Sequence, residues 1–168
     1  MKYTYCPQCG KKLGAKVLGD EGEVPFCEAC NRPWFDSFAT CTITLVINEY
    51  DEVALLRQGY VSQDFYVCVA GYIKCGENAE ETAKREVFEE LGLHAEEIRY
   101  TGSYFMEKND LLMLAFEARV KKAAFKLSQE VDRADWMTPE EAHGKMRPGS
   151  IAIQLLERYL SEKSTIES

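Results

Sequence analysis

Three glutamates lie close together in the sequence, at Glu86, Glu89 and Glu90. In a helix, Glu86 and Glu90 lie one turn apart on the same face, with Glu89 beside them. Like charges at this spacing repel one another, so they do not stabilise a helix. A divalent cation such as Mg²⁺ relieves the repulsion, because it prefers carboxylate oxygens and shares its shell with substrate phosphates. The spacing therefore indicates a metal site along a helix. The commoner explanation of such a run of glutamates, a solvated acidic face, is the alternative.

The residues around these glutamates favour a helix that can hold them in place. Ala83, Val87 and Leu91 recur every four residues, as a core-facing stripe requires. Arg85 lies beside the acidic face and can orient a carboxylate by a charge-assisted hydrogen bond. Gly92 is placed to end the helix in the left-handed conformation. We therefore expect a loop, a helix and a second loop, with a metal site along one side of the helix.

The stretch from residue 71 to residue 93 also resembles the Nudix box, G-x5-E-x7-R-E-U-x-E-E-x-G-U, where U is aliphatic. Nine positions match without a gap: Gly71, Glu77, Arg85, Glu86, Val87, Glu89, Glu90, Gly92 and Leu93. A match of this length is far more specific than a short glycine motif. The resemblance implies a Nudix fold of the α/β class, with a mixed β-sheet sandwiched between helices. It also implies metal-dependent hydrolysis of a substrate linked to a nucleoside diphosphate.

The resemblance assigns roles to individual residues. Mg²⁺ or Mn²⁺ would be held by Glu86, Glu89 and Glu90, with the Gly71 carbonyl as a further ligand, and Arg85 would belong to the catalytic set. The general base must be a carboxylate within reach of the attacking water, and Glu86, Glu89 and Glu130 are the candidates. Glu130 has two other interpretations, as a further metal ligand or as an ordinary surface acid.

Two CxxC pairs precede this stretch, Cys6 with Cys9 and Cys27 with Cys30, and 17 residues separate the pairs. The spacing is typical of a zinc site, and four thiolates complete a tetrahedral shell with no open position, so the zinc would be structural. A redox CxxC and a pair of disulfides are the alternatives. The segment has few large apolar residues, so zinc would supply its folding energy. We expect a zinc ribbon over residues 1–36 and a Nudix hydrolase domain over residues 37–168.

The rest of the chain alternates between strand and helix signals, which predicts an α/β layered domain. β-branched and apolar runs predict strands at 42–47, 53–56, 65–69, 98–105, 111–120 and 134–137. A capping box with proline at the first helical position follows at 138–141. Pro148-Gly149-Ser150 precedes a last helix, in which Ile151, Leu155 and Tyr159 would line one side.

The order of ribbon and catalytic domain is similar to the NADH pyrophosphatase branch of the Nudix superfamily. Residues 130–136 (EVDRADW) and 148–152 (PGSIA) resemble that branch's E-(I/L)-x-x-A-x-W and P-G-(S/T)-(I/V)-A segments. Enzymes of the branch often carry a further N-terminal domain, whereas this sequence begins at the ribbon. The branch's S-Q-P-W-P-F-P-x-S signature is largely replaced at residues 103–111 (SYFMEKNDL). The resemblance implies an NAD(H)-like dinucleotide substrate, cleaved to AMP and a mononucleotide, and the replaced signature puts the NADH preference in question.

The amino-acid composition limits the kinds of molecule that the protein is expected to bind. The net charge is −8, which disfavours non-specific binding of nucleic acid or membranes. The first residues contain no apolar signal segment, and the odd count of seven cysteines suits a reducing compartment, so we expect a cytoplasmic protein. A small-molecule nucleotide is the expected substrate. For the oligomeric state, a homodimer is one of the arrangements left open. ADP-ribose, a nucleotide sugar and a nucleoside triphosphate are alternative substrates. The alternative to an enzyme is a catalytically silent module that only binds a nucleotide.

Overall fold

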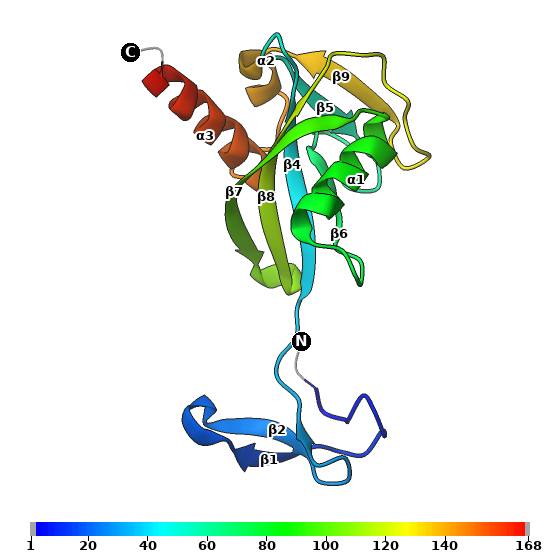
Figure 1. Ribbon diagram of the computed structural model, residues 1–168, viewed down its shortest axis with the longest axis vertical. Coiled ribbons are helices and arrows are strands. Elements are labelled where there is room, and N and C mark those ends of the chain that lie inside the picture. Colours follow the sequence, from blue (N-terminus) through cyan, green and yellow to red (C-terminus); the bar gives the residue numbers. More distant parts are fainter. Residues whose placement is uncertain (1–2, 167–168) are drawn as a thin grey trace. The chain divides into compact units, whose positions relative to one another are not determined.

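The computed structural model describes residues 3–166, and the chain divides into two compact units, Met1–Ala39 and Thr40–Ser168 (Figure 1). The sequence-based boundary, between residues 36 and 37, lies a few residues before this division. The first unit is a three-stranded antiparallel sheet in the order β1-β2-β3. Its elements are β1 (Gly14–Val17), the 3-10 turn η1 (Gly19–Glu21), β2 (Glu23–Cys27) and β3 (Arg32–Pro33).

The first unit buries few apolar side chains. Every residue of β1 is exposed, and β2 buries Val24, Phe26 and Cys27. So small a core contributes little free energy of folding, because the hydrophobic contribution scales with the apolar area removed from water. The unit therefore depends on another source of stability, and its cysteines are the side chains suited to provide one.

The second unit is built on a six-stranded sheet in the order β7-β8-β4-β5-β9, with β6 paired to β4. Its strands are β4 (Ala39–Ile47), β5 (Val53–Arg57), β6 (Val69–Tyr72), β7 (Ala95–Met106), β8 (Leu111–Val120) and β9 (Arg133–Met137). Its helices are α1 (Ala79–Leu91), the 3-10 turn η2 (Glu107–Asn109), α2 (Pro139–His143) and α3 (Ile151–Ile166). Among residues 3–166, no helix combines the length and the apolar character needed to cross a membrane.

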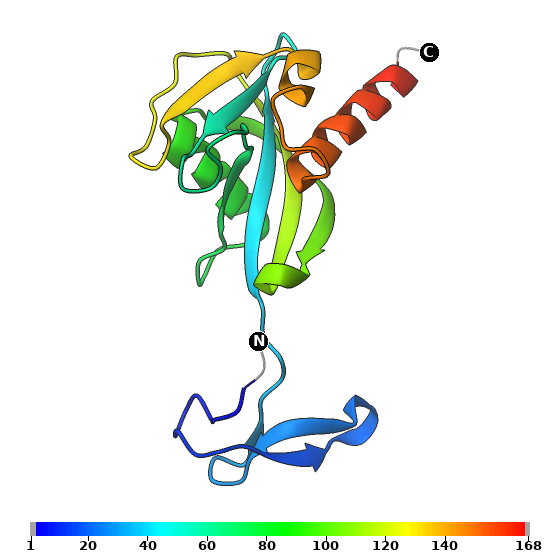
Figure 2. The same cartoon turned by 180° about the vertical axis from the view of Figure 1, so that it is seen from behind.

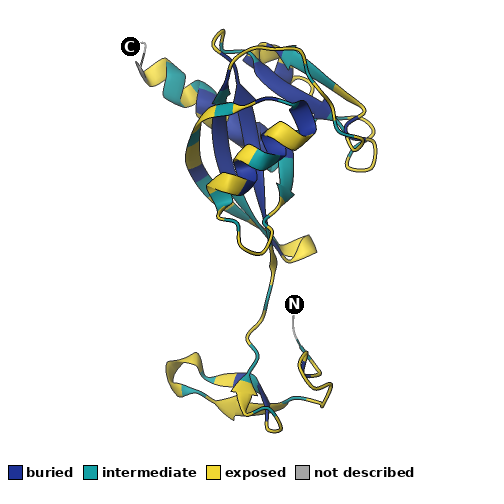
Figure 3. Ribbon diagram, turned by 45° about the vertical axis from the view of Figure 1, so that its right-hand side comes forward, coloured by how far each residue is buried: buried dark blue, intermediate teal, exposed yellow. Residues whose placement is uncertain are grey.

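Helices cover both faces of this sheet, so the expected sandwich is confirmed. Alternate residues of β4 point to opposite faces, as the pleat of a strand requires. Ile43, Leu45 and Ile47 join the core beneath α2 and α3, whereas Val46 joins the core beneath α1. Figure 3 shows α1 with its exposed side turned outward over the buried strands, and Figure 2 shows α2 and α3 from behind. β4 is consequently the central strand, buried on both faces.

β4 pairs with two different strands along one of its edges. Its first half pairs with β6, where Thr42 lies opposite Gly71, and its second half pairs with β5, where Val46 lies opposite Ala54. The predicted strand at 65–69 is therefore wrong in its limits. Val67 makes an isolated bridge to β5, and the strand begins at Val69, where the chain moves to β4. Gly71 thus lies within a strand beside α1.

Local sequence signals set the ends of the helices, as expected at Gly92 and Thr138. Asn78 and Glu81 form a capping box at the start of α1, and Gly92 ends that helix with φ 69°. Thr138 caps α2 in the same way, with Pro139 at the first helical position. The hydroxyl of Ser150 accepts a hydrogen bond from the Ile153 peptide N–H in the first turn of α3, over 3.3 Å. The limits of α1, which carries the three glutamates, are therefore set by its own capping residues.

Candidate functional site

The three glutamates occupy different environments on α1. Glu86 and Glu90 are 9% and 4% exposed, whereas Glu89 lies on the exposed side of the helix. Ala83, Val87 and Leu91 are fully buried, so the predicted core-facing stripe is confirmed. Two carboxylates are thus held at the edge of the contact between α1 and the sheet, where burial disfavours their charged form.

Gly71 makes room for one of these carboxylates. A Cβ at position 71 would overlap the carboxyl group of Glu86. The φ of Gly71 lies outside the left-handed region, so this glycine is required by close approach and not by backbone conformation. The sequence placed Gly71 in a loop before the helix, whereas the structure places it in strand β6, where the Glu86 carboxyl group leaves no room for a side chain.

Arg85 connects three glutamates. Its Nη1 donates to Oε1 of Glu86 over 2.6 Å and to Oε2 of Glu89 over 2.9 Å. Its Nε and Nη2 donate to the two carboxylate oxygens of Glu77 over 2.7 and 2.9 Å. The bidentate pair fixes the guanidinium plane and holds the pKa of Glu77 down at about 2. The expected orienting role of Arg85 is thus visible in its contacts, and Glu77 acts as its anchor.

Glu90 is held by a residue outside the box. Gln58 is 4% exposed, and its Nε2 donates to Oε1 of Glu90 over 2.9 Å. Oε2 of Glu90 is buried, and within residues 3–166 it makes no hydrogen bond. Burial, together with the negative charges of Glu86 and Glu130, raises the pKa of Glu90 to about 7, although Gln58 and the Ala70 backbone act in the opposite direction. Burial likewise raises the pKa of Glu86, against the effect of Arg85.

Glu130 lines an open hollow of about 530 Å³ together with Gly59, Tyr60, Gln129 and Asp132. Burial and the charges of Glu130 and Glu90 raise the pKa of the Tyr60 phenol. Gln58, the neighbour of Gly59 in the chain, donates to Glu90, so the hollow lies close to a buried carboxylate of α1. The Gly59 peptide N–H donates to Oδ2 of Asp132 over 2.7 Å, which ties the loop after β5 to the loop before β9. The structure therefore brings Glu130 toward Glu86 and Glu90 from a distant part of the sequence.

Gln58 and Tyr60 are site residues that the sequence did not reveal. Both lie in a short loop with no metal or nucleotide motif, and a lone glutamine or tyrosine is usually structural. The only local signal is the polar pair Arg57-Gln58 directly after the apolar run of β5. Their relation to α1 depends on how the sheet is assembled, so only the tertiary structure reveals it.

The carboxylates have the chemistry that a divalent cation requires. Glu90 offers a buried oxygen without a donor, which a cation would satisfy. Glu86 and Glu89 each already accept a hydrogen bond from Arg85. Groups of three or more His, Cys, Asp or Glu side chains can hold a metal ion where their ligand atoms all lie within 4.8 Å of one another. Among residues 3–166, the four cysteines are the one such group. The α1 carboxylates are therefore suited to a cation by chemistry and burial, but they are less closely gathered than the thiols.

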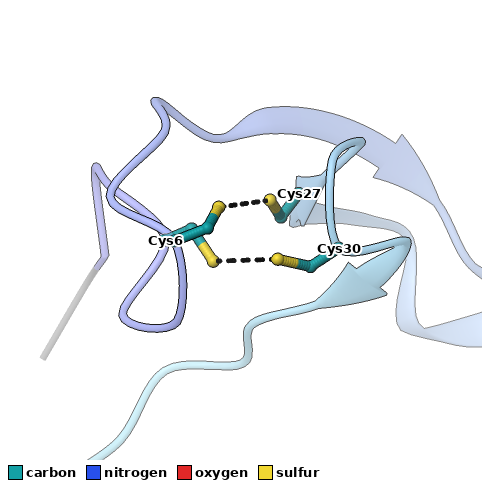
Figure 4. Close-up of side chains that lie close together, drawn as sticks. Cys6, Cys27 and Cys30 are labelled. Carbon is teal, nitrogen blue, oxygen red and sulfur yellow. Dashed lines mark hydrogen bonds between the residues drawn. The ribbon is translucent and has the colours of Figure 1, made fainter.

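The four cysteines of the first unit fit a tetrahedral metal site. The Sγ atoms of Cys6 and Cys30 are 3.9 Å apart, and those of Cys9 and Cys27 are 3.6 Å apart. A tetrahedron with Zn–S bonds of 2.3 Å has edges of about 3.8 Å. Figure 4 marks these two contacts with dashed lines, and Cys30 projects toward Cys6. All four are free thiols, so the disulfide alternative does not describe this structure.

Comparison with known proteins agrees with this geometry. The family model described as NUDIX domain matches residues 38–155. NAD-capped RNA hydrolase NudC from Pseudomonas syringae pv. syringae is 29% identical over 97% of this chain and 58% of its own length. Mitochondrial NAD(P)H pyrophosphatase NUDT13 from Mus musculus is 31% identical over 90% of this chain and 44% of its own length. The chain thus spans about half the length of these relatives.

Solved structures show the same fold. A Nudix hydrolase from Nitrosomonas europaea superposes with a TM-score of 0.76 at 20% identity, over 98% of this chain and 93% of that one. The Nudix domain of Shewanella oneidensis NrtR, solved as a complex with ADP ribose, gives a TM-score of 0.64 at 15% identity, over 76% of this chain and 90% of that one. At these identities the likeness extends to the fold alone.

Proposed function

The chain belongs to the Nudix family, and we propose that it hydrolyses the diphosphate of an NAD(H)-like dinucleotide to AMP and a mononucleotide. The observation that carries the proposal is the buried pair Glu86 and Glu90, with Glu90 hydrogen-bonded to Gln58, whose neighbours Gly59 and Tyr60 line a hollow together with Glu130. The relatives support the substrate class, since their names refer to NAD-capped RNA and to NAD(P)H. The net charge of −8 favours the free dinucleotide over an RNA-linked one.

We propose that Glu86, Glu89 and Glu90, with the Gly71 carbonyl, hold Mg²⁺ or Mn²⁺. When bound, the cation supplies charge neutralisation at the diphosphate and acidifies water for attack. Arg85 holds Glu86 and Glu89 in position, and Glu77 holds Arg85. Phosphoryl transfer requires mainly positioning and charge neutralisation, and this set of residues provides both.

We assign the general-base role to Glu130. Glu86 and Glu89 both accept hydrogen bonds from Arg85, whereas Glu130 faces the open hollow where a substrate can enter. Glu130 would take the proton of the attacking water as the new phosphorus–oxygen bond forms. The bridging phosphorus–oxygen bond then breaks, and its electron pair leaves with the departing phosphate.

A substrate panel tests the proposal. The protein is incubated with NADH, ADP-ribose, a nucleotide sugar, a nucleoside triphosphate and NAD-capped RNA, in Mg²⁺ or Mn²⁺, and AMP, mononucleotide and phosphate are measured. We expect AMP and a mononucleotide from NADH, and their loss when Glu130 is replaced by Gln. No product from any substrate would contradict the proposal and favour a silent nucleotide-binding module.

Two further parts of the proposal concern the metal held by the first unit and the cellular location of the protein. We propose that Cys6, Cys9, Cys27 and Cys30 hold structural Zn²⁺, which is supported by sulfur spacings close to a tetrahedral edge. We further propose that residues 1–36 act as a zinc ribbon and that residues 37–168 act as the hydrolase domain. A cytoplasmic location suits the free thiols Cys41, Cys68 and Cys75.

A further inference from the structure

Gln58 is a buried polar residue that the proposed reaction does not itself require. It follows directly after β5 and is 4% exposed. Its carbonyl accepts hydrogen bonds from the peptide N–H groups of Val61 and Ser62, both over 2.9 Å. Its side chain donates to Glu90 over 2.9 Å. Backbone and side chain are therefore both held, which fixes the amide in one orientation.

The contact with Gln58 affects the two oxygens of Glu90 differently. Oε1 accepts the amide N–H, whereas Oε2 is buried with no donor in the part of the chain described, residues 3–166. An amide is neutral, so it fixes the carboxylate without cancelling its charge, as Lys or Arg in that position would. The carboxylate is thus oriented by one oxygen, and its other oxygen keeps its capacity to bind a cation.

We propose that Gln58 is a positioning residue that orients Glu90 for binding of the divalent cation. This inference rests on the proposed function, because it assigns a role to Gln58 through Glu90. Hydrogen-bonding partners behind metal ligands commonly set the ligand's orientation and the site's affinity. Gln58 lies 32 residues before Glu90 in the sequence, outside every motif that pointed to the site.

The backbone next to Gln58 extends this role to the other side of the hollow. The Gly59 peptide N–H donates to Oδ2 of Asp132 over 2.7 Å, and the Asp132 peptide N–H donates to the Arg57 carbonyl over 2.9 Å. These two bonds tie the end of β5 to the loop that carries Glu130. The same short segment therefore holds Glu90 through a side chain and the Glu130 loop through the backbone.

The experiment compares Gln58→Met, Gln58→Asn and the control Gln154→Met, which changes an exposed glutamine on α3. Met has a similar shape but no donor, and Asn keeps the amide on a shorter side chain that does not reach Glu90. The Kd for Mn²⁺ is measured from the electron paramagnetic resonance signal of free Mn²⁺. Measurements are made below the unfolding transition of each metal-free variant, so a loss of folding does not enter the Kd.

We expect both Gln58 variants to bind Mn²⁺ about 10–100-fold more weakly, with the control unchanged. We also expect both Gln58 variants to hydrolyse NADH more slowly, and part of this activity to return at high Mn²⁺ concentration. Kd values for both variants within twofold of the unmodified protein would overturn the inference and leave the proposed function standing. An unmodified protein that neither binds Mn²⁺ nor hydrolyses a nucleotide would overturn both.

Discussion

The carboxyl group of Glu86 occupies the space that a side chain on Gly71 would need. This relationship between a strand residue and a helix residue predicts the effect of a single methyl group. In Gly71→Ala the new Cβ displaces the carboxylate, because β6 is paired to β4 and is not free to move away. A displacement of about 1 Å can reduce turnover about 100-fold. We therefore expect a loss of kcat/KM of this order with a small change in Tm.

Gly144→Ala provides the control for this variant. Gly144 ends α2 with φ −70°, and a Cβ there meets only ordinary contacts. The Gly144→Ala variant should therefore hydrolyse NADH as fast as the unmodified protein. If Gly71→Ala hydrolyses NADH within threefold of the unmodified protein, the Glu86 carboxylate does not need its observed position.

The second prediction concerns the proposed cation ligands. Glu89→Gln and Glu90→Gln should each lower turnover by orders of magnitude, because each removes negative charge from the cation site. Folding should be little affected, since Glu89 is exposed and Glu90 is buried with a raised pKa, so a neutral side chain suits its surroundings. Glu80→Gln, in the exposed first turn of α1, is the matched control. Full activity of both variants at saturating metal would exclude these two residues as ligands.

The third prediction concerns the cysteine cluster. Elemental analysis of protein purified without chelator should find one Zn²⁺ per chain, bound by four thiolates at about 2.3 Å. Cys27→Ser should lose the metal and the structure of the first unit, because that unit buries too little apolar surface to fold unaided. Cys75→Ser, an exposed cysteine outside the cluster, should keep the zinc. A metal-free protein with an unchanged first unit in NMR spectra would contradict this assignment.

The fourth prediction concerns stability at low pH, for which Asp51 is the test residue. Its carboxylate accepts hydrogen bonds from Lys163 and Tyr159 on α3 and from Arg119 on β8. These partners, Lys163 first, lower the pKa of Asp51 to about 2. A lowered pKa stabilises the fold above the unfolded value of 3.8, and this stability is lost as the pH falls toward 2.

Asp51→Asn removes this charge but keeps a residue that tolerates the φ of 60° at this turn. The contacts are partly exposed, so we expect a loss of about 1 kcal/mol at pH 7. This corresponds to a fall in Tm of about 3 °C, shrinking as the pH falls below 4. Asp64→Asn, an exposed control, should leave Tm unchanged. A constant difference in Tm between pH 7 and pH 3 would show that the Asp51 charge does not contribute.

The fifth prediction concerns selectivity. The turn between β7 and β8 is formed by η2 (Glu107–Asn109) and by Asp110 with φ 46°. It contains none of the prolines and no tryptophan of the NADH pyrophosphatase signature, so it is more flexible and offers less stacking surface. We expect NADH to be cleaved with only weak preference over ADP-ribose and other dinucleotides. A kcat/KM for NADH about 100-fold above every rival, or about 2.7 kcal/mol, would show that this turn does not set selectivity.

The sequence alone predicted several features that depend on neighbours along the chain. Most of the box residues lie on one helix, so their spacing indicated the acidic face, the buried stripe and a hydrogen bond from Arg85 to a carboxylate. The capping residues Thr138 and Ser150 set helix limits for the same reason. The paired CxxC spacing likewise predicted a four-thiol cluster, because each pair binds one edge of a tetrahedron.

Only the tertiary structure decided what depends on contacts between distant segments. The change of partner along β4 moved the strand at Val69–Tyr72 beside α1, which placed Gly71 against Glu86. The hydrogen bond from Gln58 to Glu90 and the bond from Gly59 to Asp132 join residues far apart in the sequence. No local pattern encodes such contacts, because they arise from the order and pairing of strands in the assembled sheet.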